Sequence, residues 1–443
     1  MHGDDLAGIH VQKILQQLVA DVGCRDAQKA GGAKDAAHLE RPGIFEGKGG
    51  GCNGILHGQP AFHEVFPVKV ELGCAVHVAE HLRESTLDRE KVLSIARERN
   101  ASLVISTCID QANAIACYVA EELNLPHPYS YKTAVNVTDK VLMKEIMAVN
   151  SIPTAKYFYI NSIEHFHPES LTYPIIVKPA DCNGSKGVRR IDKNDSNEQE
   201  YIKAALALSR NGYAIIEEFK EGKEVGVDCL IVNGKAHLLM TRERRKIDIN
   251  NDGIQQIYGS YWPAPISNKQ QQNLCSVAQK IADAFHLYNT PLMMQTIVSE
   301  NEINVIEFAP RIGGGENYHI IKILTEYDII EAAVNSFLGM EISLDYKKPT
   351  FYIGDNYIYA RPSVFGAMRI NDEAKSLIEY ANIYRCAGSE IGKDISSSNR
   401  VGVFCTKEYT IKDLQEKTNK VLKHTDVYDV SGNSIMRKDI YEL

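Results

Sequence analysis

The sequence has no long apolar run and no excess of basic residues. Because no stretch of about 18 apolar residues occurs, the sequence predicts no membrane span. The formal net charge is −8 and the isoelectric point is about 6.0. This balance argues against a general nucleic-acid binder, which usually carries a basic face. A small anionic ligand stays open, since local cations decide its binding.

Paired cysteine spacing and a secretory signal are also missing. The ten cysteines are scattered along 443 residues, which predicts reduced thiols and a cytoplasmic protein rather than a disulfide framework. The N-terminus lacks the charged-then-apolar pattern of a signal peptide. Hydrophobic residues make up 44% and charged residues 24% of the chain. These values are typical of a globular protein with room for about three domains.

Tyrosine is absent before Tyr118, and the first 84 residues differ from the rest of the chain. They hold 13 of the 31 glycines and 7 of the 14 histidines. A shift of this kind predicts a domain boundary, or else a fusion or a misread gene start in which residues 1–84 are not native to the fold.

Two motifs in this first segment suggest ligands but lack the required context. The glycine run at 47–51 would need a preceding strand and a following helix to hold phosphate, so a flexible loop is the simpler interpretation. Nearby Cys and His residues could bind zinc, although their spacing matches no common zinc pattern. These residues are Cys52, His57, His63, Cys74, His77 and His81.

Regular secondary structure is expected from Ser85 onward. Thr86 can cap a helix from about Leu87 to Asn100. A buried strand at Leu103–Ser106 and a second helix at Gln111–Leu123 follow. This β–α alternation predicts a parallel sheet.

A phosphate-binding loop is predicted after the strand at 174–178. The strand ends at Lys178, and the loop carries Gly184, Ser185, Lys186 and Gly187 before a new strand begins at Val188. Glycine lets the backbone approach phosphate closely. Helices are expected near 138–150 and 197–209, and a further strand at 214–217.

Two hairpins can be placed in register by hand. Asn233-Gly234 is a strong two-residue turn signal between strands at 227–232 and 235–240. Folding the next hairpin about Asn301 places Gln295 directly opposite Glu307, and such cross-strand neighbours have Cβ atoms about 5 Å apart. Their oxygen atoms suit Mg²⁺. A small α/β unit is expected from about residue 345, with a strand at 401–404 and a helix at 411–422.

Other charged residues follow in an order that suits ATP chemistry. Glu217, Glu218 and Phe219 end a strand, and Glu224 lies seven residues after Glu217. Arg311 precedes a glycine run at 313–315, where a cation and free N–H groups can hold a transferred phosphate or a substrate carboxylate.

Four residues have two open interpretations. The cluster of Arg242, Arg244 and Arg245 either binds a substrate carboxylate or is a solvated charge run. His319 either contacts substrate or is structural.

These segments together resemble the ATP-grasp superfamily. The motifs are Ile176-Val177-Lys178-Pro179 with residues 183–187, Ile216-Glu217-Glu218-Phe219 with Glu224, and Val305 to Arg311. The spacing of Gln295 and Glu307 is similar to the metal-binding hairpin of the carbamoyl phosphate synthetase large chain. The Arg-Ile-Gly-Gly-Gly segment and the C-terminal unit resemble L-amino-acid ligases. The resemblance covers about residues 85–443.

The resemblance implies an α/β chain with the α+β ATP-grasp fold, in which two subdomains clamp ATP behind a partial parallel α/β domain. The implied segments are residues 1–84, an atypical Gly- and His-rich stretch; 85–130, the remainder of the preceding domain; 131–216, the small subdomain; 217–344, the large subdomain with the metal site; and 345–443, a C-terminal α/β subdomain.

The resemblance also implies a role for each matching residue. Catalytic roles fall to Lys178, which reaches the phosphates, and to Arg311, which steadies an acyl phosphate. Gln295 and Glu307 would hold Mg²⁺ or Mn²⁺. The ATP-binding residues would be Lys140, Lys178, Gly184, Ser185, Lys186 and Gly187 at the phosphates, Glu217, Glu218 and Phe219 at the adenine, and Glu224 at the ribose.

The chain departs from the family pattern in two places. Many relatives carry Asn two residues after the metal glutamate, where this chain has Ala309. The family usually opens with a strand and a glycine turn, which residues 1–84 do not show.

The predicted activity is an ATP-dependent ligation of a carboxylate to an amine with release of ADP and phosphate. The expected partners are small-molecule carboxylate and amine substrates, without nucleic acid or membrane, and a homodimer stays open. Two alternatives remain: activation of bicarbonate, as in carbamoyl phosphate synthetase or a carboxylase, and a non-catalytic ATP-binding module. A protein kinase is disfavoured, because the His-Arg-Asp and Asp-Phe-Gly signatures are absent.

Overall fold

The computed structural model describes Leu82 and residues 84–182, 185–247, 255–393 and 395–441. They belong to two compact units, one that ends at Ile353 and one that continues from Gly354. The glycine run at 47–51, the Cys and His residues suggested for zinc, and Gly184 lie outside the described residues. Within the described residues, no helix has both the length and the apolar character needed to span a bilayer.

Helix α2 (Arg89–Glu98) begins later than the sequence predicts. Its N-cap is Asp88, whose side chain accepts a hydrogen bond from the backbone N–H of Lys91. The expected cap at Thr86 is therefore wrong, because an aspartate closer to the helix satisfies the free N–H groups equally well. The helix predicted here is confirmed, and its buried residues are Val92, Leu93, Ile95 and Ala96.

The expected strand at Leu103–Ser106 is also wrong. This segment is irregular and leads into helix α3 (Asp110–Glu122), which itself confirms the helix predicted there. A strand is held by hydrogen bonds to a neighbouring strand, and within residues 84–130 no other strand lies beside this segment. Residues 84–130 therefore contribute helices, and the parallel sheet is not found in them.

The helix predicted near 138–150 is confirmed, and it follows another helix that the sequence does not predict. Helix α4 (Tyr131–Thr138) is followed at once by α5 (Lys140–Val149). Asp139 lies between them as the C-cap of α4 and the N-cap of α5. The Asp139 carboxylate caps α5 by accepting hydrogen bonds from the N–H groups of Val141 and Leu142. The sequence pattern does not reveal α4, because half of its residues are Thr or Val, which favour strands.

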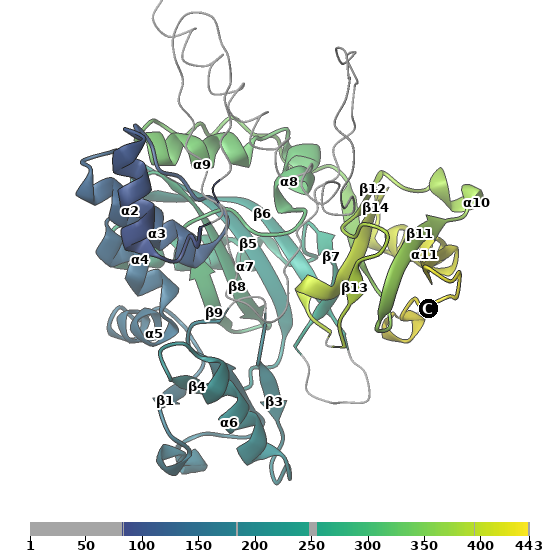
Figure 1. Cartoon of the computed structure of the whole chain (residues 1–443), viewed down its shortest axis with the longest axis horizontal. Coiled ribbons are helices and arrows are strands. Elements are labelled where there is room, and N and C mark those ends of the chain that lie inside the picture. The colour runs from purple at the N-terminus through teal and green to yellow at the C-terminus, as the bar shows by residue number, and fades with distance from the viewer. Residues whose placement is uncertain (1–81, 83, 183–184, 248–254, 394, 442–443) are drawn as a thin grey trace, which may run out of the picture. The chain divides into compact units, whose positions relative to one another are not determined.

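The smaller sheet of the first unit is antiparallel and has the strand order β1-β4-β2-β3. Its strands are β1 (Tyr157–Ile160), β2 (Ile175–Pro179), β3 (Arg189–Ile191) and β4 (Ala214–Glu218). Helix α6 (Glu198–Leu208) covers one face, where Ile202 packs against Ile175 and Ile216 (Figure 1). The strands and the helix predicted for this region are confirmed.

The larger antiparallel ladder of this unit runs β7-β6-β5-β8-β9. The turn at Asn233-Gly234 has positive φ angles of 51° and 75°, which confirms the predicted hairpin. The strands are β5 (Lys223–Val232), β6 (Lys235–Lys246), β7 (Ile257–Trp262), β8 (Thr290–Val298) and β9 (Ile303–Ala309).

Three more helices are found among the described residues of the first unit. Helix α7 (Asn268–Ala284) buries Leu274, Ala278 and Ile281 in the core formed with the larger ladder. This core also holds Phe285 and Phe308, whose rings meet edge to face with centroids 4.9 Å apart. The other two helices are α8 (Asn317–Thr325) and α9 (Ile329–Leu338).

The second unit contains strands in the orders β12-β14-β10 and β13-β11-β15. The strand and helix predicted at 401–404 and 411–422 are confirmed as parts of β14 and α11. The elements are β10 (Tyr352–Tyr359), β11 (Ser363–Ile370), α10 (Asp372–Lys375), β12 (Tyr380–Ile383), β13 (Glu390–Ile391), β14 (Arg400–Glu408), α11 (Ile411–Lys423) and β15 (Thr425–Asp429).

Candidate active site

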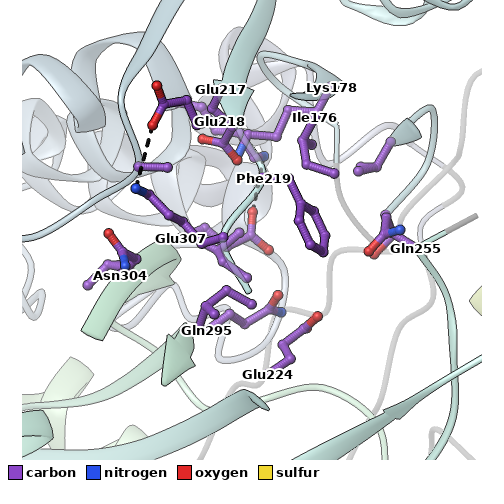
Figure 2. A pocket seen from close by; sticks show the side chains of 18 of the residues that line it. Ile176, Lys178, Glu217, Glu218, Phe219, Glu224, Gln255, Gln295, Asn304 and Glu307 are labelled. Atoms are coloured by element: carbon purple, nitrogen blue, oxygen red, sulfur yellow. Dashed lines mark hydrogen bonds and ion pairs between the residues drawn. The ribbon is translucent and has the colours of Figure 1, made fainter. Parts of the chain in front are cut away.

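A pocket in the first unit is lined by residues of both of its sheets (Figure 2). It brings together most of the residues singled out in the sequence. Those that line it are Lys140, Lys178, Ser185, Lys186, Glu217, Glu218, Phe219, Glu224, Gln295 and Glu307. Gly187 and Arg311 are not among the lining residues.

The loop between β2 and β3 turns tightly at Ser185 and Gly187. Both residues have positive φ angles, 57° and 74°. A Cβ atom on Gly187 would lie 2.7 Å from Leu208 Cδ1 and 2.9 Å from Pro179 Cγ. Gly187 is therefore required by the packing of the loop, while the neighbouring Ser185 and Lys186 face the pocket.

Glu217 lies between two buried lysines. Its Oε1 atom accepts a hydrogen bond of 2.6 Å from Lys178 Nζ, and its Oε2 atom lies 2.8 Å from Lys144 Nζ. The second contact is an ion pair without the angle of a hydrogen bond. Burial alone would raise the pKa of Glu217, but the two lysines outweigh it and lower the pKa to about 2. Glu217 is therefore a carboxylate with its charge already matched.

Glu218 and Phe219 are fixed by backbone hydrogen bonds. The N–H of Glu218 donates to Lys156 O, and the N–H of Phe219 donates to Pro174 O. The Phe219 ring carries the Arg190 guanidinium 4.5 Å from its centroid. The Phe219 N–H is bonded to Pro174 and is not available to a ligand, whereas the apolar ring lies at the pocket and can contact a flat ligand.

Glu224 is held at the pocket by two cations from β6. Arg244 Nε lies 3.1 Å and Lys246 Nζ 2.9 Å from its carboxylate oxygens. Burial would raise the pKa of Glu224, but these cations lower it. The carboxylate is thus ionised and can accept hydrogen bonds from hydroxyl groups.

Gln295 and Glu307 are paired across β8 and β9, as the sequence predicts. The turn itself has Val298 opposite Ile303, and a bulge at Ile306 shifts the ladder by one residue. Without the bulge, Glu307 would pair with the buried Met294, on the other face of the sheet. The bulge therefore keeps Glu307 on the pocket face.

The oxygen atoms near Glu307 suit a metal ion that also binds a phosphorylated ligand. Asn304 also lines this part of the pocket (Figure 2), whereas Ala309 is buried opposite Met293 and offers no side-chain oxygen. Among the described residues, no three Cys, His, Asp or Glu side chains are grouped as a metal site. One carboxylate with amide oxygens suits Mg²⁺, which commonly keeps waters and binds substrate phosphates besides one or two carboxylates.

Lys140 occupies the space between the glycine loop and Glu307. Its Nζ atom lies 3.4 Å from Glu307 Oε2 and donates a 2.8 Å hydrogen bond to Cys182 O. It is the first residue of α5, and the Asp139 cap fixes that helix end. Lys140 therefore partly balances the charge of Glu307.

Arg311 forms a two-point ion pair with Asp110 at the start of α3. Its Nε and Nη2 atoms donate to the two carboxylate oxygens, and Nη1 donates to Ile312 O at 2.7 Å. Burial would lower the pKa of Arg311, but Asp110 raises it above the usual value. The preceding segment thus positions the arginine that the sequence singles out.

The cluster at 242–245 is not a solvated charge run. Arg242 is buried, pairs with the buried Asp228 and lies 4.9 Å from the Trp262 ring centroid. Arg245 lies over the Tyr261 ring at 4.2 Å. These arginines and His319 lie outside the set of residues that line the pocket. Burial lowers the pKa of the half-buried His319.

The sequence pattern does not reveal several charged residues that pair with the residues described above. Lys144, Asp110 and Asp228 resemble ordinary surface charges in the sequence, because burial and long-range pairing have no local pattern. The lysine four residues after Lys140 lies on the same helix face, which is the one available signal for Lys144. Further lining residues not anticipated are Lys246, Gln255 and Asn304.

Residues 171–318 match the family model of the ATP-grasp domain. The phosphoribosylamine–glycine ligase of Leptospira interrogans is 27% identical over 274 residues, which cover 57% of this chain and 63% of that protein. The L-arginine-specific L-amino acid ligase of Bacillus subtilis is 23% identical over 266 residues, 59% of this chain and 63% of that protein. The chain thus spans less than two thirds of these relatives.

Solved structures share the fold. The crystal structure of an L-amino acid ligase from Bacillus licheniformis has a TM-score of 0.66 at 18% identity and covers 77% of this chain and 85% of that one. Phosphoribosylglycinamide synthetase from Anaerococcus prevotii has a TM-score of 0.60 at 17% identity, with 78% and 87% covered. The expected α+β ATP-grasp fold is confirmed.

Proposed function

We propose, from the premise that this chain carries an ATP-grasp domain at residues 171–318, that it is an ATP-dependent carboxylate–amine ligase. The observation that carries the proposal is the convergence of Lys178, Glu224 and the Gln295–Glu307 pair in one pocket. A magnesium–nucleotide complex requires cations for the phosphates, an acceptor for the ribose hydroxyls and oxygen ligands for the metal. Relatives named as ligases support the reaction class.

In the proposed reaction, a substrate carboxylate oxygen attacks the γ-phosphorus of ATP, and the bond to the β–γ bridging oxygen breaks. The products are an acyl phosphate and ADP. An amine then attacks the acyl carbon, so that phosphate leaves, a proton is released and an amide forms. Catalysis of this kind depends mainly on positioning and charge neutralisation.

The residues of the chain have distinct parts in this proposal. Lys140, Lys178 and Lys186 neutralise the phosphates, with Ser185 and Gly187 in the loop beside them. Glu217, Glu218 and Phe219 border the base, and Glu224 accepts hydrogen bonds from the ribose hydroxyls. Arg311 steadies the acyl phosphate. Gln295 and Glu307 would hold Mg²⁺ or Mn²⁺, which supplies positive charge to the phosphate oxygens.

We propose further that the chain works in the cytoplasm on small-molecule acids and amines. The free thiols among the described residues suit a reducing compartment. A homodimer belongs to the same proposal, and light scattering of the purified chain would test it.

An ADP-release screen of acid and amine pairs, with mass spectrometry of the product, tests the reaction. In an active pair, we expect Glu307→Ala to lower ADP release on the order of 100-fold, the loss seen when one stabilising group is removed from a transition state. Glu300→Ala, at an exposed position of the same hairpin, serves as the matched control.

Three results would contradict the proposed reaction or its residue roles. Full turnover of Glu307→Ala would show that Gln295 and Glu307 do not hold an essential metal ion. ADP release that requires bicarbonate but no amine would indicate the carboxylase-type reaction. ATP binding without ADP release for any pair would indicate a non-catalytic module.

A further inference from the structure

Lys144 is the most deeply buried lysine described in this chain. Only 1% of its surface is exposed, and it lies on α5, one turn after Lys140. Holding a charged amine away from water is costly unless other groups compensate it. Lys144 does not line the pocket, so direct contact with a ligand does not explain its burial.

The surroundings of Lys144 are polar on one side and aromatic on the other. Its Nζ atom donates to Thr154 Oγ1 at 2.7 Å and lies 2.8 Å from Glu217 Oε2. The Tyr157 ring centroid is 5.0 Å away. Glu217 in turn accepts the hydrogen bond from Lys178. The three charged groups therefore form one buried cluster, of which Lys178 and Glu217 reach the pocket.

The charges of this cluster do not cancel. Two lysines and one carboxylate leave one net positive charge, and Lys178 presents it to the pocket. If Lys144 were absent, Glu217 would neutralise Lys178, and the pair would have little attraction for an anion. Charge interactions in such a buried place are screened far less than at the surface.

We propose that Lys144 is a positioning residue for the nucleotide site: it takes up the charge of Glu217, so that Lys178 keeps its attraction for the phosphates. This inference rests on the proposed function, because it takes the anion to be the triphosphate of ATP. Thr154 fixes Lys144 in place, since the Thr154 hydroxyl donates a 2.8 Å hydrogen bond to Val305 O on β9.

The test measures ATP binding by calorimetry in Mg²⁺ buffer. Lys144→Met should weaken ATP binding about tenfold or more, since it removes one unit of charge near the phosphates. AMP binding should weaken less, because its single phosphate lies farther from Lys178 if Lys178 contacts the β- and γ-phosphates. Lys132→Met, at an exposed lysine on α4, makes the same chemical change and should leave ATP binding unaltered.

A double variant separates charge from packing. In Lys144→Met with Glu217→Gln, Lys178 alone supplies the cluster charge, which again equals one. Because Glu217 also borders the base in the proposed site, the readout is the ratio of ATP affinity to AMP affinity, in which a change at the base cancels. This ratio should lie within about threefold of the wild-type ratio. The double variant also decides the question if Lys144→Met alone does not fold, because it leaves no unpaired buried carboxylate.

The outcomes distinguish this inference from the proposed function. Equal ATP binding by the wild type and Lys144→Met would overturn the inference alone. The same is true if the ratio of ATP affinity to AMP affinity in the double variant is as low as, or lower than, that in the single variant. If the wild-type chain does not bind ATP, the proposed function is overturned and the inference with it.

Discussion

The pKa of Lys144 predicts that ATP binding depends on alkaline pH. Burial lowers the pKa of Lys144 to about 8, while Glu217 opposes this shift and the neighbouring Lys178 adds to it. Tyr157 from β1 and Glu307 from β9 also face this group. Loss of the proton above pH 8 would bring the cluster of Lys144, Glu217 and Lys178 to zero net charge.

We therefore expect the affinity for ATP to fall about tenfold between pH 7.5 and 9.5. Phosphate groups, with a second pKa near 6, stay ionised over this range, so the change belongs to the protein. Calorimetric titrations at several pH values would measure it. Lys144→Met should show a flat profile, and a flat profile in the wild type would contradict the expectation.

Replacing Asp110 should change both the stability of the protein and the rate of ADP release. Asp110→Asn removes the charge that faces the partly buried Arg311 but keeps one acceptor oxygen. We expect the free energy of unfolding to fall by about 1–3 kcal/mol and the rate of ADP release to fall about tenfold or more, with ATP binding unchanged. Urea unfolding and the ADP assay would measure these effects.

The control for Asp110→Asn is an exposed ion pair. Glu326 and Lys347 are paired at 2.6 Å, and both side chains are about two thirds exposed. Glu326→Gln should change the free energy of unfolding by less than about 1 kcal/mol. If Asp110→Asn is equally mild in both measurements, Arg311 does not depend on its partner.

Sequence reasoning at this scale finds residues that belong to motifs and misses their partners. Lys178, Glu217 and Glu307 stand in recognisable segments, and the pocket contains all three. Lys144 and Asp110 are single charged residues on helices, and their meaning depends on residues 73 and 201 positions away. Such pairings are decided by the tertiary fold and leave no local pattern.

At the scale of elements, the loop between β2 and β3 depends on Gly187. Gly187→Ala adds a Cβ atom in close contact with Leu208 and Pro179 and also strains a positive φ angle. We expect a loss of about 2–4 kcal/mol in the free energy of unfolding, from strain and overpacking together. Urea unfolding measures this loss.

Gly212→Ala separates the two causes. Gly212 has a φ angle of 77°, but a Cβ atom there would meet nothing within 4 Å. This variant should lose only about 1 kcal/mol, from backbone strain. Equal losses in the two variants would show that the contacts of Gly187 do not matter.

Hairpins with clear turn signals are predictable, and their finer register is not. The Asn233-Gly234 turn is found where the sequence places it. In the next hairpin, the pairing of Gln295 with Glu307 is correct, although the turn has Val298 opposite Ile303 and the bulge at Ile306 restores the pairing. The strand expected at 103–106 failed because an apolar run does not reveal whether a partner strand lies beside it.

At the scale of the whole molecule, the sequence suggested five segments, and the described residues fall into two compact units. The five-segment division remains a prediction. Boundaries inside a compact unit are difficult to infer, because the composition does not change where one sheet gives way to the next. The β4–β5 connection, only four residues long, shows how little sequence separates them.

Ligand binding should stabilise the unit that contains the pocket. We expect ATP with Mg²⁺ to raise the unfolding temperature. At an ATP concentration one hundred times the dissociation constant, the free energy of unfolding should rise by about 2.7 kcal/mol. Mg²⁺ without nucleotide should give no comparable rise. Thermal unfolding with each ligand alone and with both would measure this, and Glu307→Ala should lose most of the combined effect. A full rise with Mg²⁺ alone would contradict it.

The reason lies in the amino group of Lys140, which sits beside the Glu307 carboxylate and the carbonyl of Cys182. It acts as a resident counter-ion, so a divalent ion that arrives unaccompanied meets a competitor already in place. When a nucleotide binds, the Lys140 amine can pair with a phosphate instead, which leaves the Glu307 carboxylate available to the metal ion. Metal and nucleotide would then be recruited as one event, and fluctuations of free magnesium alone would leave the pocket unchanged.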